Sequence, residues 1–275
     1  MSERLSTRFT SLKREGRAGL VAYIMASDPD HETCFEILHG LPEAGADVIE
    51  LGFPFTDPMA DGPSIQKAAL RALKAGGSLR NTLDLARRFR ETNAETPLIL
   101  MGYANPIESM GYGAFASAMH ASGADGAIIV DLPPEEDAPL RAAFAAHDLS
   151  IIRLAAPTTD DNRLTKVLDG ASGFLYYVSV AGVTGAAAAA AGAVRAAVER
   201  LKRATDLPIA VGFGVRAPET ARAIAETADA VVVGSAFVDE IAAAPPGQAA
   251  EHVLRKVRLL SEAVRSARAM EGTPA

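Results

Sequence analysis

Tryptophan is absent from this chain of 275 residues, and cysteine occurs once, as Cys34. A lone cysteine excludes an internal disulfide framework and fits a reducing compartment, so we expect a cytoplasmic protein. The sequence has no run of eighteen apolar residues, and its charged first nineteen residues lack the apolar core of a secretory signal. We therefore expect neither a membrane span nor export. Acidic residues outnumber basic ones and the net charge is −7, which argues against a nucleic-acid surface.

Eight short apolar runs recur along the sequence, and each is continuous rather than alternating. Continuous runs are typical of parallel strands that are buried on both faces. Amphipathic segments separate them, and this alternation predicts a (β/α)8 TIM barrel formed by residues 1–275 as a single domain. The predicted strands are residues 19–26, 47–53, 97–103, 126–132, 149–156, 173–180, 208–215 and 230–236.

Helices are expected between these strands, with further helices outside the simple repeat. Residues 2–16 predict an extra N-terminal helix under the barrel floor, and residues 78–93 an additional helix after the second strand. The alanine-rich residues 185–193 favour a helix start, since alanine carries no chemistry, with a mobile loop as the alternative. The other predicted helices are residues 31–45, 64–77, 135–148, 193–205, 218–228 and 249–271.

Active sites of (β/α)8 barrels lie at the C-terminal ends of the strands and in the loops that follow. All six lysines and all five histidines fall in helical or terminal segments, which argues against a Schiff base and against a histidine-bound metal. What remains is acid–base chemistry by carboxylates. The polar residues at strand ends are Ser27, Asp28, Glu50, Asp57, Asp61, Tyr103, Asn105, Asp131, Tyr176, Ser179 and Thr184.

Glu50 is a carboxylate inside the apolar run of residues 47–53. Desolvation there should raise its pKa into the range where it can both give and take a proton. The alternative is a structural ion pair with Arg153 on the fifth predicted strand, and the residues alone leave the two interpretations even.

The loop after the second strand offers weaker candidates. Asp61 precedes Gly62-Pro63, and its position alone favours an N-cap for the next helix. Asp57 before Pro58 is a common turn residue. Tyr176 on the sixth strand would ordinarily be a core aromatic residue.

Glycines end the last two predicted strands, as Gly214 and as Gly234 followed by Ser235. Backbone N–H groups approach a phosphate closely only where no side chain intrudes, and phosphate sites in this fold often lie after strands seven and eight. Gly185 after the sixth strand would complete such a cup. Simple turn glycines are the alternative, and the adjacent pair favours phosphate.

Several motifs together resemble the tryptophan synthase alpha chain family, in order and spacing, over nearly the whole chain. The resemblance implies cleavage of indole-3-glycerol phosphate to indole and glyceraldehyde 3-phosphate in tryptophan biosynthesis. The motifs are ELGFPFTDPMADGPSIQKA (50–68), LMGYANPI (100–107), GAIIVDLPPEE (126–136), YYVSVAGVTG (176–185), VGFGVRAPE (211–219) and VVVGSAFV (231–238).

The same resemblance implies roles for matching residues. Glu50 corresponds to the general acid–base, Asp61 to the carboxylate that faces the indole N–H, and Tyr176 to the tyrosine near the reacting carbons. The implied substrate-binding residues are Tyr23, Met101, Thr184, Gly185, Gly214, Gly234 and Ser235.

A partner is also implied, the tryptophan synthase beta chain in an alpha2-beta2 heterotetramer. Pyridoxal phosphate is expected on that partner, and no cofactor is expected on this chain. Proline-stiffened loops at the strand ends would form the contact, through Asp57, Pro58, Asn105 and Pro133. Two other interpretations stay open: another phosphate-binding TIM-barrel isomerase, lyase or flavin enzyme, and a non-catalytic subunit that only binds a phosphate ligand.

Overall fold

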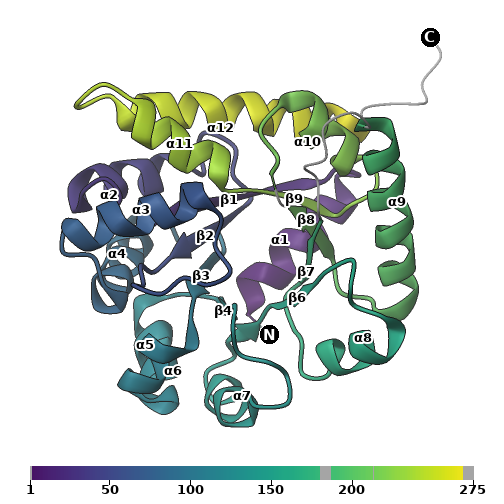
Figure 1. Cartoon of the computed structure of the whole chain (residues 1–275), viewed down its shortest axis with the longest axis horizontal. Helices are drawn as coiled ribbons and strands as arrows, with labels where there is room; N and C mark the ends of the chain where they lie inside the picture. Colours follow the sequence, from purple (N-terminus) through teal and green to yellow (C-terminus); the bar gives the residue numbers. More distant parts are fainter. Residues whose placement is uncertain (1, 180–186, 213, 269–275) are drawn as a thin grey trace.

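The computed structural model describes residues 2–179, 187–212 and 214–268. Nine strands form one parallel sheet in the order β5-β4-β3-β2-β1-β9-β8-β7-β6. Figure 1 shows the sheet rolled into a barrel with helices around it. The strands are β1 Gly19–Met25, β2 Val48–Gly52, β3 Leu98–Gly102, β4 Gly126–Ile129, β5 Ser150–Ile151, β6 Arg153–Ala155, β7 Leu175–Val178, β8 Ile209–Gly212 and β9 Ala230–Val233.

The predicted fifth strand pairs with two different neighbouring strands along its length, and this closes the barrel. β5 and β6 both belong to the predicted fifth strand, residues 149–156, and Ile152 lies between them. β5 pairs with β4, whereas β6 pairs with β7. The N–H of Ile152 still donates to the carbonyl of Ala127 in β4, with a donor–acceptor distance of 3.0 Å. The predicted (β/α)8 barrel is confirmed, with β5 and β6 as two halves of its fifth strand.

The helices follow the predicted alternation and add several short ones. They are α1 Glu3–Arg14, α2 His31–Gly40, α3 Pro63–Lys74, α4 Leu79–Thr92, α5 Ala104–Met110, α6 Tyr112–Ser122, α7 Ala138–Ala145, α8 Asp161–Leu168, α9 Ala187–Ala204, α10 Pro218–Ala225, α11 Ser235–Ala243 and α12 Ala249–Arg265, followed by a 3₁₀ turn, η1 Ser266–Arg268.

Some helix boundaries differ from the prediction because prolines and alanines near the helix ends shift them. α2 stops at Gly40, just before Leu41-Pro42, instead of continuing to residue 45. α7 begins only at Ala138, because Pro139 is tolerated in a first turn but lacks the N–H that a helix starting at residue 135 would need there. α9 starts at Ala187, six residues before the predicted start, so the alanine-rich stretch from there on is helical, as its composition favours.

The N-terminal helix closes the floor of the barrel, as predicted. In Figure 1 the barrel is seen nearly end-on and α1 crosses its centre. Leu5, Phe9 and Leu12 of α1 are buried against inward side chains of the strands, among them Val21 and Val48. These contacts fill the lower half of the barrel interior, and the strands terminate at the other end, where active sites of this fold lie.

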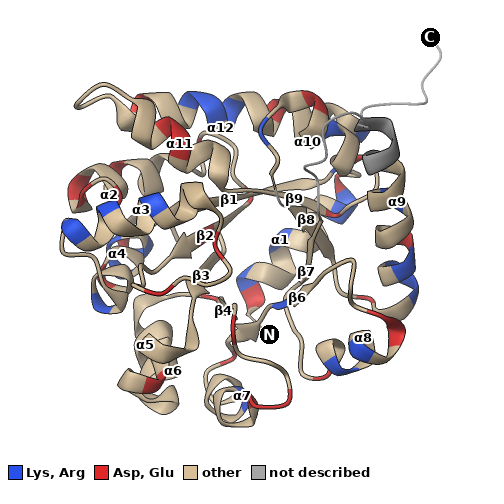
Figure 2. Cartoon of the chain, in the orientation of Figure 1, with Lys and Arg blue, Asp and Glu red and all other residues tan. Residues whose placement is uncertain are grey.

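Charged side chains lie mainly on the outer helices. Figure 2 shows Lys and Arg mixed with Asp and Glu along α9 and α12 rather than gathered by sign. In the part of the chain that the structure describes, no helix combines the length and the apolar character that a membrane crossing requires.

Candidate active site

A cavity of about 330 Å³ opens at the C-terminal end of the barrel. Most of its wall is apolar, and its polar groups come from different strand ends, as expected for a small-molecule site in this fold. It collects most of the predicted site residues. Those lining it are Tyr23, Glu50, Asp61, Met101, Tyr176, Gly214, Gly234 and Ser235.

Glu50 projects from the middle of β2 into this cavity. The residue is 1% exposed, and its Oε1 atom has no hydrogen-bond partner among the described residues. Burial raises the pKa of Glu50 from 4.5 to about 8. A carboxyl group with this pKa is partly protonated at neutral pH and can both donate and accept a proton.

The alternative role for Glu50, an ion pair with Arg153, is wrong. Arg153 points out of the barrel and pairs instead with Asp137, the residue that precedes α7. Arg141 of α7 contacts the same carboxylate, with 3.0 Å between Nε and Oδ1. The arginine of the fifth strand therefore anchors a helix to the outside of the sheet, and Glu50 has no cationic partner in the described part of the chain.

Asp61 lies on the loop after β2, and it is not the N-cap of α3. The capping position belongs to Gly62, and no side chain caps this helix. Burial raises the pKa of Asp61, while a hydrogen bond with the hydroxyl of Tyr103 acts in the opposite direction. The capping interpretation is therefore wrong, and the Asp61 carboxylate is left facing the cavity and Tyr103.

Tyr103, which follows β3, receives no role from the sequence, although its hydroxyl directly after a strand end is the kind of signal that marks this fold's sites. It lines the cavity and accepts a hydrogen bond from the N–H of Ala60 at 3.1 Å. Its ring stacks at a tilt on Phe55, with 5.6 Å between centroids. Tyr103 thus ties the loop of Asp61 to the end of the third strand.

Two further tyrosines face the cavity near Glu50. Tyr23 pairs in register with Glu50 across β1 and β2, and it is 7% exposed. Burial raises its pKa, and the charges of Asp61 and Glu50 add to the effect. Burial also raises the pKa of Tyr176 on β7, with a further contribution from Glu50. Both phenols therefore stay protonated near neutral pH, and their hydroxyl groups can form hydrogen bonds with a ligand.

Backbone of three predicted phosphate residues also lines the cavity. Gly214 follows β8 with φ of 73°, a left-handed conformation that favours glycine. Gly234 precedes α11, and a Cβ atom added there would lie 3.2 Å from Cδ1 of Tyr23. Ser235 is the first residue of α11, so the positive end of a helix dipole faces this part of the cavity.

Two predicted residues of the phosphate cup, Thr184 and Gly185, lie outside the described residues. The predicted partner-contact residues Asp57, Asn105 and Pro133 are exposed, and Pro58 is half-buried. Asp57 and Pro58 follow β2, Asn105 lies in the first turn of α5 after β3, and Pro133 follows β4. All four therefore share the strand-end side of the barrel with the cavity. Met59 between them is 82% exposed, the largest exposure among the large hydrophobic side chains described.

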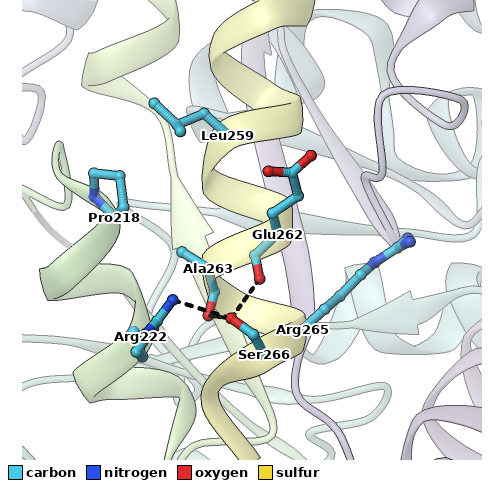
Figure 3. A pocket seen from close by; sticks show the side chains of 7 residues that line it. All are labelled: Pro218, Arg222, Leu259, Glu262, Ala263, Arg265 and Ser266. Atoms are coloured by element: carbon cyan, nitrogen blue, oxygen red, sulfur yellow. Dashed lines mark hydrogen bonds between the residues drawn. The ribbon is translucent and has the colours of Figure 1, made fainter. Parts of the chain in front are cut away.

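A second hollow, of about 630 Å³, lies on the outside between α10 and α12. Figure 3 shows its lining, where Arg222 donates to the hydroxyl of Ser266, with 3.2 Å between the atoms. It contains none of the predicted site residues. In residues 2–179, 187–212 and 214–268, no three His, Cys, Asp or Glu side chains gather as a metal site would require.

Comparison with known proteins identifies the family. The family model of the tryptophan synthase alpha chain matches residues 9–269. The tryptophan synthase alpha chain of Caulobacter sp. (strain K31) is 58% identical over 270 residues, which cover 97% of this chain and 98% of that protein. That of Phenylobacterium zucineum (strain HLK1) is 57% identical over 267 residues, 96% of each chain.

Solved structures agree with the sequence relatives. The alpha subunit of tryptophan synthase from Legionella pneumophila str. Paris superposes with a TM-score of 0.89 at 40% identity, covering 96% of this chain and 98% of that one. Tryptophan synthase from Mycobacterium tuberculosis gives a TM-score of 0.86 at 35% identity, covering 96% and 99%. The resemblance read from the motifs is thereby confirmed, and the chain belongs to the tryptophan synthase alpha chain family.

Proposed function

We propose that the cavity around Glu50 is where this chain cleaves indole-3-glycerol phosphate. As a member of its family, the chain is a lyase of tryptophan biosynthesis that forms indole and glyceraldehyde 3-phosphate. The observation that supports this site most strongly is the isolation of Glu50, a buried carboxyl group with no ion-pair partner among the described residues, in a largely apolar cavity. Such a group costs stability, and its presence in the cavity wall is explained by acid–base chemistry.

The reaction needs an electron sink, and the substrate itself supplies one. Protonation of the indole ring at C3 gives an indolenine-like tautomer, whose C=N bond accepts the electrons of the breaking carbon–carbon bond. We assign the proton transfer to C3, and removal of the proton from the glycerol C3′ hydroxyl, to Glu50. Its pKa of about 8 suits both steps near neutral pH.

Asp61 is proposed to face the indole N–H and to stabilise the positive charge that develops at N1. A fixed carboxylate in a water-poor cavity does this more strongly than water would. Tyr103, which hydrogen-bonds with Asp61 and with the loop backbone, would hold that carboxylate in position.

The remaining contacts orient the substrate. Tyr176 would lie beside the reacting carbons, and Tyr23 and Met101 would contribute to the indole pocket. Gly214, Gly234 and Ser235 would bind the phosphate through the backbone and the α11 dipole, completed by Thr184 and Gly185 as the resemblance implies. Phosphate binding is remote from the breaking bond and helps to orient the reacting atoms.

Aldol cleavage through a Schiff base has no candidate residue here. The six lysines, among them Lys67 of α3 and Lys202 of α9, all lie on helices, and none lines the cavity. The proposed mechanism needs no cofactor on this chain.

A beta chain is the expected partner, because the family is the alpha chain of a two-component synthase. We propose an alpha2-beta2 heterotetramer in the cytoplasm, with pyridoxal phosphate on the beta chain only. Indole is neutral and apolar, so transfer within a complex would prevent its loss. The contact would include Asp57, Pro58, Asn105 and Pro133, which lie on the strand-end side of the barrel.

A coupled assay for glyceraldehyde 3-phosphate released from indole-3-glycerol phosphate tests the activity directly. Addition of the cognate beta chain should raise the rate, because a partner that orders the β2 loop would position Asp61. Sedimentation of the mixture should show the complex. A rate that is the same with and without the beta chain would contradict the proposed coupling.

Asp61→Asn tests the second carboxylate. The substitution should lower kcat by about tenfold or more, as is typical for loss of a charge-stabilising group. An active-site carboxylate whose replacement by Asn leaves kcat unchanged would have only a structural role. The comparisons lend no support to an isomerase, a flavin enzyme or a non-catalytic binding subunit.

A further inference from the structure

The cavity has an uneven balance of charge. Its described lining includes the carboxyl groups of Glu50 and Asp61 but one cationic side chain only, that of Arg216. A phosphate carries up to two negative charges near neutral pH, and glycine backbone neutralises them only in part. A phosphorylated ligand in this cavity therefore meets one full positive charge among the described lining residues, that of Arg216.

Arg216 lies on the loop after β8, two residues beyond Gly214. Its Nη1 atom is 2.6 Å from Oδ2 of Asp239 on α11, and its Nη2 atom is 3.4 Å from the hydroxyl of Ser64 on α3. The arginine therefore bridges two helices across the edge of the cavity, and Ser64 lines the cavity beside it.

Asp239 fixes where the guanidinium lies relative to the phosphate end. It is four residues after Ser235 on α11, so it lies on the same helix face, one turn from the helix N-terminus. The same arginine thus starts beside one predicted phosphate residue, Gly214, and ends one helical turn from another, Ser235. These two contacts use two of the five N–H donors of a guanidinium, so the group has further donors for a ligand at the helix N-terminus.

We propose that Arg216 is a specificity-determining residue that binds the phosphate group of the substrate. In the free chain the guanidinium rests on Asp239 and Ser64, and in the complex it shares its donors between Asp239 and the phosphate. This inference rests on the proposed function, since it assigns the phosphate to the Gly214 and Ser235 end of the cavity. The glycine cup would hold the phosphate, and Arg216 would select the charged ligand over an uncharged one.

The exposure of the Arg216 ion pair shows whether its replacement would disturb the fold. Its side chain is 54% exposed and that of Asp239 is 41% exposed. Exposed ion pairs contribute little to stability, so replacement of Arg216 should leave the fold intact. Its contribution to ligand binding can then be measured without interference from unfolding.

The test compares Arg216→Gln with Arg222→Gln, a control on α10 that faces the outer hollow instead of the cavity. In Arg216→Gln, KM for indole-3-glycerol phosphate should rise about tenfold or more, as expected for loss of a charge-assisted hydrogen bond, while kcat changes much less. The inhibition constant of glycerol 3-phosphate should rise by a similar factor, and that of indole should not change. Arg216→Lys should recover part of the affinity, because charge is kept and the planar fork is lost.

A KM for Arg216→Gln within twofold of the Arg222→Gln value overturns the inference. So does an equal weakening of indole and glycerol 3-phosphate. Calorimetric binding of glycerol 3-phosphate separates this inference from the proposed function. If the parent chain cleaves no substrate but loses glycerol 3-phosphate binding in Arg216→Gln, the reaction is wrong and the role of Arg216 stands.

Discussion

The two ends of the barrel bury carboxylates in opposite ways. At the floor, Asp47 and Asp125 are 2% and 1% exposed, and each is surrounded by donors. At the top, Glu50 is 1% exposed and its Oε1 atom has no partner among the described residues. Equal burial therefore says nothing about role, and the surroundings of the carboxylate separate a structural acid from a reactive one.

The floor repeats one hydrogen-bonding device along the barrel. Asp47, Asp125 and Asp229 each directly precede a strand, and each accepts the N–H near the start of the neighbouring strand, at Leu20, Leu98 and Ile209, over 2.8–3.0 Å. In the fifth strand the N–H of Ile151 donates instead to the hydroxyl of Ser172, three residues before β7. The device satisfies N–H groups at the strand starts, which would otherwise be orphaned under α1.

Basic side chains complete the pairing at the floor. Arg17 contacts both oxygens of Asp47 at 2.9 Å, and Arg4 and Arg90 lie 3.0 and 3.1 Å from Asp125. Among residues 2–179, 187–212 and 214–268 no cation pairs with Glu50, since Arg153 is engaged with Asp137 outside the sheet. The barrel thus concentrates stability at one end and leaves an unpaired acid at the other.

The largest effect should come from Glu50→Gln, which keeps the shape of the side chain but cannot transfer protons. We expect kcat to fall about 10²–10⁴-fold, the usual contribution of one acid–base group, with substrate binding largely kept. The matched control is Glu36→Gln on the exposed face of α2. Steady-state kcat and a binding titration measure the two effects. A kcat within a few-fold of the parent would make Glu50 structural.

Asp125→Asn should destabilise the fold at the floor of the barrel without changing the reaction rate. It leaves Arg90, which is 12% exposed, without its carboxylate, and removal of one partner from a buried pair typically costs about 3–5 kcal/mol. The control is Asp84→Asn, whose exposed pair with Arg87 should contribute less than about 1 kcal/mol. Denaturant unfolding measures both, and kcat of the folded Asp125→Asn chain should equal that of the parent. Equal stability losses in the two variants would contradict the comparison.

The pH dependence of stability should differ between Glu50→Gln and the parent. The pKa of Glu50 is raised on folding, from 4.5 to about 8, so its protonated form favours the folded state. Its contribution to stability is complete below pH 4.5 and is lost as the pH rises to about 8. Glutamine does not titrate, so Glu50→Gln should gain about 2 kcal/mol over the parent between pH 6 and pH 8. Denaturant midpoints at the two pH values test this, and parallel curves would show that Glu50 ionises normally.

Much of this contrast could be predicted from the sequence. Continuous apolar runs fix the barrel, and a Glu within such a run predicts a desolvated carboxyl group. The role of Arg153 could not be predicted. Neighbouring residues of a strand, such as Arg153 and Leu154, point to opposite faces, but the sequence does not show which of the two points into the barrel. The position of Tyr103 after a strand marks it as a candidate, but its contact with Ala60 could not be predicted, and neither could that of Arg216 with Asp239, since each partner lies far away in the chain.

Ser27 provides the smallest and sharpest test, because it is an unpaired polar group at the top end with no place in the reaction. Its φ of 66° is left-handed, it is 1% exposed, and its hydroxyl has no partner among the described residues. Ser27→Gly removes backbone strain of about 1 kcal/mol and an unsatisfied hydroxyl, and it adds about 0.5–1 kcal/mol of chain entropy to the unfolded state.

We therefore expect Ser27→Gly to stabilise the fold by about 1 kcal/mol, which is a rise in Tm of about 2 °C for a chain of this size, with kcat unchanged. Ser27→Ala separates the two causes, because it removes the hydroxyl and keeps the strain, so its gain should be smaller. Thermal unfolding of the three chains measures the order Gly, Ala, Ser. If Ser27→Gly is less stable than the parent, the hydroxyl of Ser27 makes a favourable contact. The destabilising lack of a partner at the strand-end side of the barrel would then be a property of Glu50 and not of Ser27.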